Sequence, residues 1–497
     1  MVSRLLDGWL PPVVVGVVAF VAARLAMLPG LGFWDTAELQ TVAPLLGTAH
    51  PTGYPTYVIL GWFANLLLTP FGEPALRMNI FAGLCVAIAV GVTVDLVRAL
   101  TRSPVLAVAA GLGLAFTTIV WKIGLQAEAH ALHLALTAIL FRLLVAWEQG
   151  RRDRTLIAAA IVFGLAVGNH SLSLLLAPPV GLYVFALEPG IVRRPRLVGG
   201  AVLALLLTVV LVFLELPLRA GPFRAPLVYG HPETWDGFWY VALAEQFRGS
   251  LIDPIGDLAT KTGALVGRTV TAFGPLAALI PIGFATTLVM RPRYALLSGT
   301  AALLTCFFAA SYVNADIGRY YLVPAFIAWT WLAILAAGAA SLVGYNLSPR
   351  RGPAPAMAFV LAAVLLAPTV ADIPVRFRTI DRSSDRSAPA WVDRALDVMA
   401  PDAVIVSWWS YSTALWYAQL VQGRGPNILI IDDRTRLDDN LGGITDVIDR
   451  YLPTRPVYVI RIEPTDIATL EQHYSLVYLD GLNPSGLTQV LGREPGS

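Results

Sequence analysis

The stretch Gly32-Phe33-Trp34-Asp35-Thr36-Ala37-Glu38-Leu39 stands directly after the first long apolar run, which extends from Pro11 to Leu28. A second polar stretch, Ala49-His50-Pro51-Thr52-Gly53-Tyr54-Pro55, follows it closely. Asp35 and Glu38 are thus expected where a membrane segment meets water, and a carboxylate at that depth is costly unless it has a partner or a function. We interpret this loop as the chemical centre of the protein.

The composition is that of an integral membrane protein. Of the 497 residues, 56% are hydrophobic and 14% are charged, and the mean hydropathy is +0.67. Soluble domains carry about 25% charged residues. The net charge of +2 provides no bulk field for nucleic acid. Cys85 and Cys306 both lie in apolar runs, so we expect core residues, with no disulfide framework, no metal site and no bound cofactor.

Apolar runs long enough to cross a bilayer, about 20 residues each, recur along the chain. We predict an α-helical polytopic membrane domain over residues 1–372 with about eleven spans, the first of them retained as a helix rather than cleaved as a signal peptide. The predicted spans are 11–28, 78–97, 104–120, 129–147, 155–169, 172–188, 197–217, 264–290, 294–312, 321–345 and 354–371.

The run 55–69 is shorter and bounded by prolines, which favours an interfacial or re-entrant helix over a span. If it does not cross and the N-terminus is cytoplasmic, five arginine clusters all fall inside, as the positive-inside rule requires. Residues 29–77 then form the first outer loop, and the last span exits outward. The clusters are Arg98/Arg102, Arg151/Arg152/Arg154, Arg193/Arg194/Arg196, Arg291/Arg293 and Arg350/Arg351.

The tail, residues 373–497, changes in character and is predicted to be a small extracytoplasmic α/β domain. Short β-rich runs at 403–406, 428–431 and 457–460 alternate with helix-like stretches at 411–422 and 443–451. This alternation predicts a parallel sheet. No glycine fingerprint for a dinucleotide follows any of these strands.

Asp35 and Glu38 allow two interpretations. With a helix beginning at Thr36, Asp35 would be its N-cap and Glu38 its third residue, which is a variant of the capping box. In the other interpretation, a carboxylate on this outer loop takes the proton from an attacking hydroxyl. The two roles are compatible, because a capped turn holds a carboxylate in place.

Other polar residues are expected at the same outer surface. The His50-Pro51 segment is either a purely structural turn or part of the site. Glu128 and His130 are expected to line a substrate cavity, although His130 and His133, at i, i+3, also resemble a metal pair that lacks a third ligand. Asn169 and His170 mark a helix break, beside a cavity or as a satisfied helix end. Arg319 either snorkels to lipid headgroups or binds a phosphate, and Arg219 and Arg224 are weaker candidates for that anion. An amphipathic helix lying on the membrane surface is predicted by the aromatic residues Trp235, Phe238, Trp239 and Tyr240, which could also line a groove for a lipid chain.

Several of these motifs together resemble a known family. Asp35-x-x-Glu38, His50-Pro51-x-Gly53-Tyr54-Pro55, the apolar 55–69 segment and Arg77-x-Asn79 are similar to the GT-C glycosyltransferases, and more narrowly to their protein O-mannosyltransferase-like branch. The match is dense over residues 30–175. Ala37 departs from the glycine that the family often has before the glutamate.

The resemblance implies a GT-C-like enzyme of the plasma membrane that passes a sugar, with inversion, from a polyprenyl-phosphate carrier to a hydroxyl at the outer face. Asp35 would be the catalytic base, Glu38 its orienter and Arg319 the contact of the leaving phosphate. Mannose is the expected sugar, and protein Ser/Thr is the expected acceptor. The substrate-binding residues would be His50, Tyr54, Glu128, His130, Asn169, His170, Arg319 and Tyr320. A glycosyltransferase for a lipid or cell-wall glycan, a transporter of a lipid-linked sugar and a non-catalytic scaffold remain as alternatives.

Overall fold

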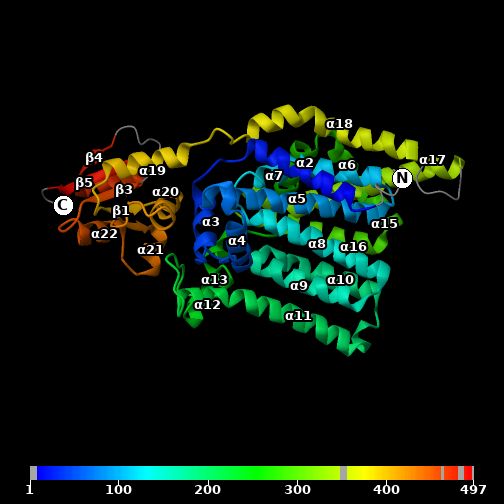
Figure 1. Cartoon of the computed structure of the whole chain (residues 1–497), viewed down its shortest axis with the longest axis horizontal. Helices are drawn as coiled ribbons and strands as arrows, with labels where there is room; N and C mark the ends of the chain where they lie inside the picture. Colours follow the sequence, from blue (N-terminus) through cyan, green and yellow to red (C-terminus); the bar gives the residue numbers. More distant parts are fainter. Residues whose placement is uncertain (1–7, 348–354, 461–463, 480–485, 495–497) are drawn as a thin grey trace.

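The protein consists of a helical bundle and a small α/β domain placed at one end of it (Figure 1). A computed structural model describes residues 8–347, 355–460, 464–479 and 486–494. The start of α2 lies at the far end of the bundle from the α/β domain (Figure 1). We call the two ends the arginine end, where α2 starts, and the domain end.

The named secondary-structure elements in the described part of the bundle are all helices. They are α2 (Leu10–Ala26), α3 (Trp34–Leu45), α4 (Pro55–Leu67), η1 (Thr69–Phe71), α5 (Pro74–Thr101), α6 (Pro104–Ala115), α7 (Thr118–Ile123), α8 (Ala129–Gly150), α9 (Asp153–Asn169), η2 (Ser171–Leu176), α10 (Ala177–Leu187), η3 (Ile191–Arg193), α11 (Pro195–Phe213), α12 (Glu215–Ala220), α13 (Trp235–Ala242), η4 (Glu245–Ser250), α14 (Leu258–Phe273), η5 (Gly274–Leu279), α15 (Ile280–Met290), α16 (Pro292–Ser311), η6 (Ile317–Tyr321), α17 (Leu322–Leu347) and α18 (Pro355–Ile380).

All eleven predicted spans coincide with helices, but not all of these helices are long. Seven are long and apolar enough to cross a membrane by length and composition. The other four, α2, α6, α9 and the η2–α10 pair, have 17 residues or fewer. The predicted span 104–120 is broken at Thr117, whose hydroxyl accepts a hydrogen bond from the indole of Trp329 (2.9 Å) and donates one to the carbonyl of Gly113 (2.8 Å). The multi-pass helical fold is therefore confirmed.

Helix α4 does not cross the bundle. At the start of α5, the Ala75 amide donates to the Tyr417 hydroxyl of the C-terminal domain (3.0 Å). One turn later, Asn79 Nδ2 donates to the carbonyl of Leu28 at the end of α2 (2.8 Å). The chain thus leaves α2 and enters α5 at the same end, with α3 and α4 between them (Figure 1).

The arginine clusters gather at the opposite end of the bundle. Arg291 Nε donates to the carbonyl of Leu100 (2.9 Å), and Arg151 Nη2 donates to that of Leu187 (3.1 Å). These bonds connect the ends of α5, α8, α10 and α15. The shared position of these arginines agrees with the predicted topology, in which the arginine clusters all lie on one side of the membrane. The fifth cluster, residues 350–351, lies outside the described residues.

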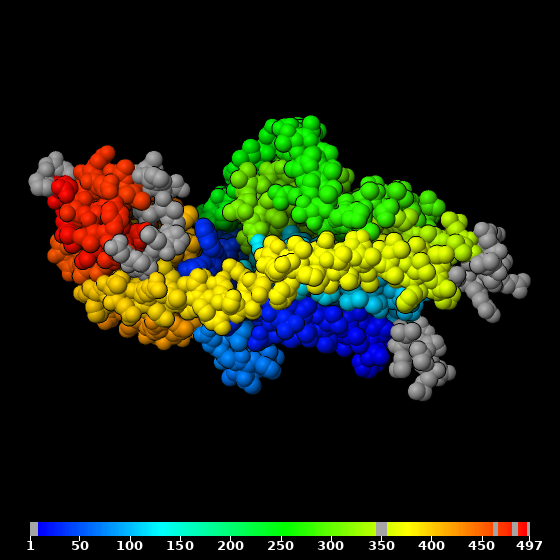
Figure 2. All heavy atoms as spheres, turned by 90° about the horizontal axis from the view of Figure 1, so that it is seen from above, coloured from blue at the N-terminus to red at the C-terminus, as the bar shows by residue number. Residues whose placement is uncertain are grey.

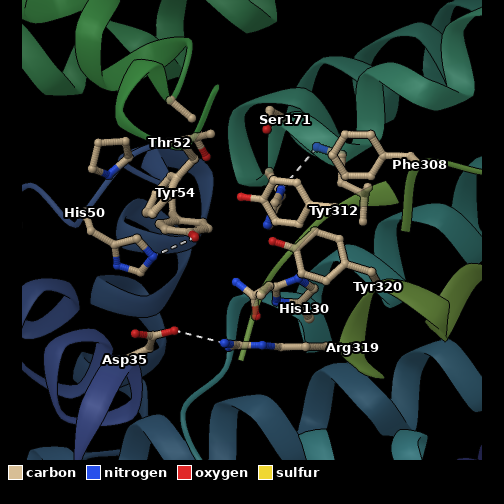
Figure 3. A pocket seen from close by; sticks show the side chains of 16 residues that line it. Asp35, His50, Thr52, Tyr54, His130, Ser171, Phe308, Tyr312, Arg319 and Tyr320 are labelled. Atoms are coloured by element: carbon tan, nitrogen blue, oxygen red, sulfur yellow. Dashed lines mark hydrogen bonds and ion pairs between the residues drawn. The ribbon is translucent and has the colours of Figure 1, made fainter. Parts of the chain in front are cut away.

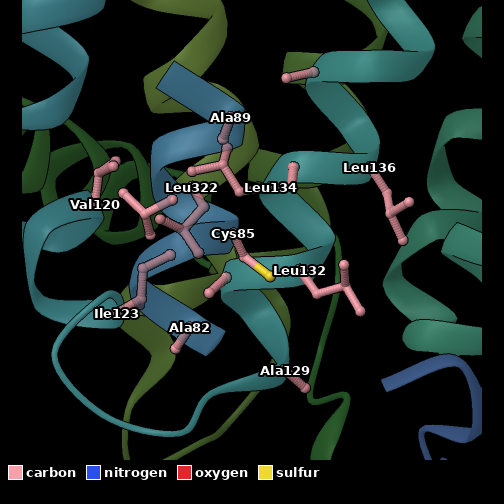
Figure 4. Close-up of a cluster of buried hydrophobic side chains, with 14 of the residues drawn as sticks. Ala82, Cys85, Ala89, Val120, Ile123, Ala129, Leu132, Leu134, Leu136 and Leu322 are labelled. Carbon is pink, nitrogen blue, oxygen red and sulfur yellow. The ribbon is translucent and has the colours of Figure 1, made fainter. Parts of the chain in front are cut away.

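The core of the bundle is formed mainly by α5, α6, α8 and α17. Small residues of α5 and leucines of α8 interlock around Cys85, whose thiol is buried among Ala82, Ala89 and Leu132 (Figure 4). Because Cys85 is buried within this apolar cluster, it is a packing residue. Helices at the edge, α11 among them, expose most of their apolar side chains.

Helix α18 continues past the predicted boundary at residue 372 and ends at Ile380. In Figure 2 it lies along the surface of the bundle and leads into the C-terminal domain. That domain contains α19 (Ser387–Val398), β1 (Val404–Ser407), α20 (Trp409–Trp416), η7 (Tyr417–Val421), β2 (Leu429–Asp432), α21 (Asp433–Asp438), α22 (Ile444–Tyr451), β3 (Val457–Ile460), α23 (Pro464–His473), β4 (Tyr474–Tyr478) and β5 (Leu487–Arg493).

The sheet has the order β2-β1-β3-β5-β4. The three predicted strands are present, and β1 pairs in parallel with β2 and β3. Strands β5 and β4 extend the sheet in antiparallel fashion, which the sequence reading did not predict. Strand β1 is buried between β2 and β3 and runs parallel to both, so the carboxyl ends of the three strands lie together, where open α/β sheets bind ligands.

Candidate functional site

Helix α3 is held at the domain end by a buried amide network. The side chain of Gln40 accepts from the amide of Gly32 (3.0 Å) and donates to Asn79 Oδ1 (2.8 Å). Asn79 in turn holds the carbonyls of Leu28 (2.8 Å) and Gly30 (3.0 Å). Gln40 and Asn79 are fully buried, so this network fixes where α3 begins relative to α2 and α5.

The predicted capping box is wrong. Helix α3 begins two residues earlier than predicted, at Trp34, and among the described residues its N-cap, Phe33, makes no side-chain cap bond. Asp35 therefore lies in the first turn, where a negative charge is favourable but no backbone amide needs its side chain. Glu38 faces inward, fully buried, and accepts from the backbone amide of His50 (2.6 Å) and from its Nδ1. Its partner is the next loop and not its own helix.

Asp35 faces a cavity of about 1120 Å³ between the bundle and the C-terminal domain. Its Oδ2 is 3.1 Å from Arg319 Nη2, and its Oδ1 accepts from Trp409 Nε1 at 3.2 Å. These partners come from η6 and from the start of α20. Figure 3 shows Asp35, His50 and Tyr54 on one side of the pocket, facing Arg319 on the other.

Arg319 is shared between two carboxylates. Its Nη1 is 3.0 Å from Glu128 Oε2, while its Nη2 contacts Asp35. Glu128 also accepts from His130, at Nδ1 (2.8 Å) and at the backbone amide (3.1 Å). The Arg319 side chain is largely buried, with 16% of it exposed, and its Nε has no hydrogen-bond partner among the described residues. Arg319 is therefore a buried cation held between two carboxylates at the cavity wall.

His50 connects the two polar segments singled out in the sequence. Its Nδ1 pairs with Glu38, and its Nε2 lies 2.9 Å from the Tyr54 hydroxyl. Burial alone would lower the pKa of His50, but the charge and hydrogen bond of Glu38 outweigh it and raise this pKa above its usual value. His50 is therefore more readily protonated than an ordinary histidine.

The carboxyl group of Asp35 has a pKa below its ordinary value. Burial would raise this pKa, but the positive charges of His50 and Arg319, together with the hydrogen bond from Trp409, lower it. Charged neighbours of opposite sign favour the ionised form of a carboxyl group. Asp35 is thus an anion at neutral pH and available to accept a proton.

A cluster of aromatic rings forms the wall beside Arg319. The ring centroids of His130 and His170 are 4.7 Å apart, and the ring centroid of Tyr320 lies 5.4 Å from that of His130. These three residues line the pocket, and His170 Nδ1 also accepts from the amide of Leu172 (3.1 Å) at the start of η2. His170 is therefore both a helix cap and part of the wall.

Asn169, predicted at a helix break, and His133, predicted as one half of a possible metal pair, have structural contacts. Asn169 is fully buried, is not part of the lining and donates to the carbonyl of Ala129 (3.1 Å). His133 Nδ1 is 3.0 Å from Ser173 Oγ. Within the described ranges, no group of three or more His, Cys, Asp or Glu side chains is placed to hold a metal ion.

The two weaker phosphate candidates lie away from the cavity. Arg219 donates to the carbonyls of Leu46 (2.8 Å) and Leu45 (3.0 Å) and so closes the end of α3. Arg224 is half exposed and 3.5 Å from Glu233. The predicted amphipathic segment forms α13, which exposes Trp235 on its surface.

The C-terminal domain supplies residues of the cavity wall that were not predicted from the sequence. Trp408 and Trp409 follow β1 directly, and Asp432 and Arg434 stand at the end of β2. The predicted parallel sheet could have indicated these residues, because ligands bind at the carboxyl ends of adjacent parallel strands in open sheets. The sequence does not show, however, that this edge of the sheet faces Asp35.

Comparison with known proteins gives two kinds of match. Residues 35–190 match the family described as Protein O-mannosyl-transferase TMEM260 N-terminal domain. The Protein O-mannosyl-transferase TMEM260 of Mus musculus is 31% identical over 242 residues, which cover 45% of this chain and 33% of the mouse protein. This chain therefore spans about a third of the length of the curated relative it matches.

Solved structures share the fold over nearly the whole chain. ArnT from Cupriavidus metallidurans, bound to undecaprenyl phosphate, superposes with a TM-score of 0.58 at 14% identity, covering 96% of this chain and 97% of that one. The oligosaccharyltransferase AglB from Archaeoglobus fulgidus, in complex with an inhibitory peptide and a dolichol-phosphate, gives 0.52 at 14% identity, covering 96% and 74%. At this identity the likeness establishes the fold.

These findings confirm the resemblance that the motifs indicated: residues 35–190 are similar to the TMEM260 N-terminal domain, and the chain shares the fold of ArnT and AglB over nearly its whole length.

Proposed function

We propose that this chain is a multi-pass membrane glycosyltransferase that transfers a sugar from a polyprenyl-phosphate carrier to an acceptor hydroxyl. The name of the mouse relative supports the transferase class. The bound undecaprenyl phosphate of ArnT and the dolichol-phosphate of AglB support a carrier of this kind. The observation that carries the proposal is the contact of Asp35 with Arg319 across the cavity, at 3.1 Å.

The two groups match the two charges that change in such a reaction. The acceptor oxygen attacks the anomeric carbon while its proton passes to Asp35. The bond between the anomeric carbon and the phosphate oxygen breaks, and the electron pair leaves with the phosphate, whose growing charge Arg319 stabilises. Attack and departure on opposite faces of the sugar invert its configuration. The bound phosphate takes the place that Glu128 holds at Arg319 in the free protein, while Asp35 keeps its own contact with Nη2.

Glu38 has a supporting role in this scheme. It is fully buried and bound to His50, so it does not reach the acceptor itself. Through His50 it places a positive charge near Asp35, which helps to keep Asp35 ionised. Tyr54, His130, His170 and Tyr320 form the wall against which a sugar ring would lie.

The finer assignments are mannose as the sugar and a protein Ser/Thr hydroxyl as the acceptor, both supported by the name of the mouse relative. We further propose a plasma-membrane location with the arginine end in the cytoplasm and the domain end outside. The positive-inside rule supports this orientation, because the described arginine clusters share one end of the bundle.

The test is sugar transfer by purified protein in detergent, with undecaprenyl-phosphate mannose and dolichyl-phosphate mannose as donors and Ser/Thr-containing peptides as acceptors. Asp35→Asn keeps the size of the side chain and removes the base, so transfer is expected to fall by about 10²–10⁴-fold. Asp316→Asn is the matched control, because Asp316 also lines the cavity but pairs with Lys122 (3.1 Å) at its exposed rim.

Two results would overturn the proposal. Full transfer by Asp35→Asn would show that Asp35 is not the base. Wild-type protein that transfers nothing with either donor, but moves the lipid-linked sugar across reconstituted vesicles, would establish the transporter alternative.

A further inference from the structure

We propose that Trp409 is a positioning residue of the active site and that, through it, the C-terminal domain orients the catalytic carboxylate. This inference rests on the proposed function of Asp35 as the base. Trp409 and Asp35 are 374 positions apart in the sequence, yet the indole Nε1 donates to Asp35 Oδ1 at 3.2 Å.

The indole and the guanidinium divide the carboxylate between them. Trp409 contacts Oδ1, whereas Arg319 contacts Oδ2 at 3.1 Å. A carboxylate has about four lone-pair positions on its two oxygens. Two donors from opposite sides therefore fix the plane of the group and leave lone pairs directed into the cavity, where an acceptor hydroxyl would deliver its proton.

The indole itself is held in one orientation. Its ring makes edge-to-face contacts with His50 (5.9 Å between centroids), Tyr229 (5.6 Å) and Trp416 (5.7 Å). These three rings come from the first loop of the bundle, the loop after α12 and the far end of α20. A donor enclosed on three sides is preorganised, so little entropy is lost when it orders its partner.

The two residues that precede Asp35 are also bound by the C-terminal domain. Phe33 packs against Trp391 (6.0 Å between ring centroids) and Tyr411 (5.4 Å), and Trp34 packs against Trp408 (5.3 Å). The start of α3 is thus fixed on the N-terminal side of the base. Docking of the domain therefore determines both where Asp35 lies and how its carboxylate is turned.

This arrangement has a measurable consequence for the ionisation of Asp35. The hydrogen bond from Trp409 stabilises the charged form and contributes to the lowered pKa of Asp35. Its removal raises that pKa and loosens the carboxylate. A purely structural tryptophan would affect folding, but it would not shift the acidic limb of the rate profile.

The experiment compares Trp409→Phe with Trp408→Phe in the full-length protein, using the mannose donors and peptides named above. Phe at 409 keeps an aromatic ring and removes the N–H. We expect kcat to fall about tenfold, with little change in KM, and the acidic limb of the pH–rate profile to move to higher pH. Trp408 lines the same cavity and packs on Trp34, without a hydrogen bond to Asp35 among those described, so its variant is the control that separates lost packing from the lost hydrogen bond.

A second substitution guards against misfolding. Benzothienylalanine at position 409 has nearly the shape of tryptophan, with sulfur in place of the N–H, and is expected to give the same loss and the same pH shift. If both changes at 409 leave kcat and the pH profile as in Trp408→Phe, while Asp35→Asn is inactive, the role of Trp409 is refuted and the function of Asp35 stands. Full activity of Asp35→Asn refutes both.

Discussion

Replacement of Arg319 is the sharpest test of how the two carboxylates and the phosphate share one cation. In the free protein, Arg319 lies 3.1 Å from Asp35 and 3.0 Å from Glu128, using a different nitrogen for each. Arg319→Gln removes the charge, and Arg319→Lys keeps it on a single nitrogen that cannot bridge both carboxylates as a fork does. The two variants therefore separate charge from geometry.

The magnitudes follow from the burial of the group. Loss of one partner from a buried ion pair costs about 3–5 kcal/mol of stability, and Glu128 has 9% of its side chain exposed. Loss of a donor that stabilises developing charge lowers the rate by about 10²–10³-fold. We expect Arg319→Gln to lose at least that much kcat/KM and to unfold at a lower temperature. Arg319→Lys is expected to lose about ten- to a hundredfold.

The assay measures kcat/KM for sugar transfer together with the thermal unfolding midpoint. Lys122→Gln is the control, because Lys122 lies in the same cavity but is half exposed and pairs with Asp316, so its pair is worth less than about 1 kcal/mol. In the double variant Glu128→Gln/Arg319→Gln, the uncompensated anion is removed, and stability should recover without activity. Recovery of activity along with stability would show that Arg319 is structural and would refute the phosphate role.

Two further predictions concern the supports of the site. The ionic stabilisation of His50 by Glu38 is fully present below the ordinary histidine pKa of 6.5 and is lost as pH rises through the raised pKa of His50; Glu38→Gln should therefore flatten the decline of the unfolding midpoint above that pH, and an unchanged slope would contradict this. Asn79→Leu leaves the amide of Ala127 and the carbonyl of Leu28 without their partner and is expected to lower stability by about 2–6 kcal/mol, at about 1–3 for each buried group; a wild-type denaturation curve would rule this out.

Much of the fold was predictable from the sequence because the bilayer imposes strong local rules. Each apolar run predicted as a span became helical, although 104–120 divided into α6 and α7, and the run 55–69 became the short α4 at the domain end, as its length and prolines indicated. The arginine pattern then predicted the topology, because it assigned each loop to one end of the bundle. Thr117 shows where this fails: the break between α6 and α7 depends on an indole of α17, a partner that no local pattern identifies.

The candidate site was predicted in its composition and not in its connections. Asp35, Glu38, His50 and Arg319 were expected near one another, and the structure brings them together. The contacts among these residues could not be predicted. The capping box that the i, i+3 spacing suggested is not formed, because Glu38 is buried against the loop that follows α3.

The polar motifs, the hydropathy and the arginine asymmetry are local or periodic properties, and they determined the helical membrane fold, its alternation and the chemical character of the first loop. Tertiary structure alone decided that Arg319 lies between Asp35 and Glu128 and that Trp409 of a separate domain reaches the same carboxylate. The reason is physical. Directional hydrogen bonds between residues hundreds of positions apart depend on how the domain docks on α3, and docking is set by the shapes of packed aromatic side chains, which leave no period or spacing in the chain.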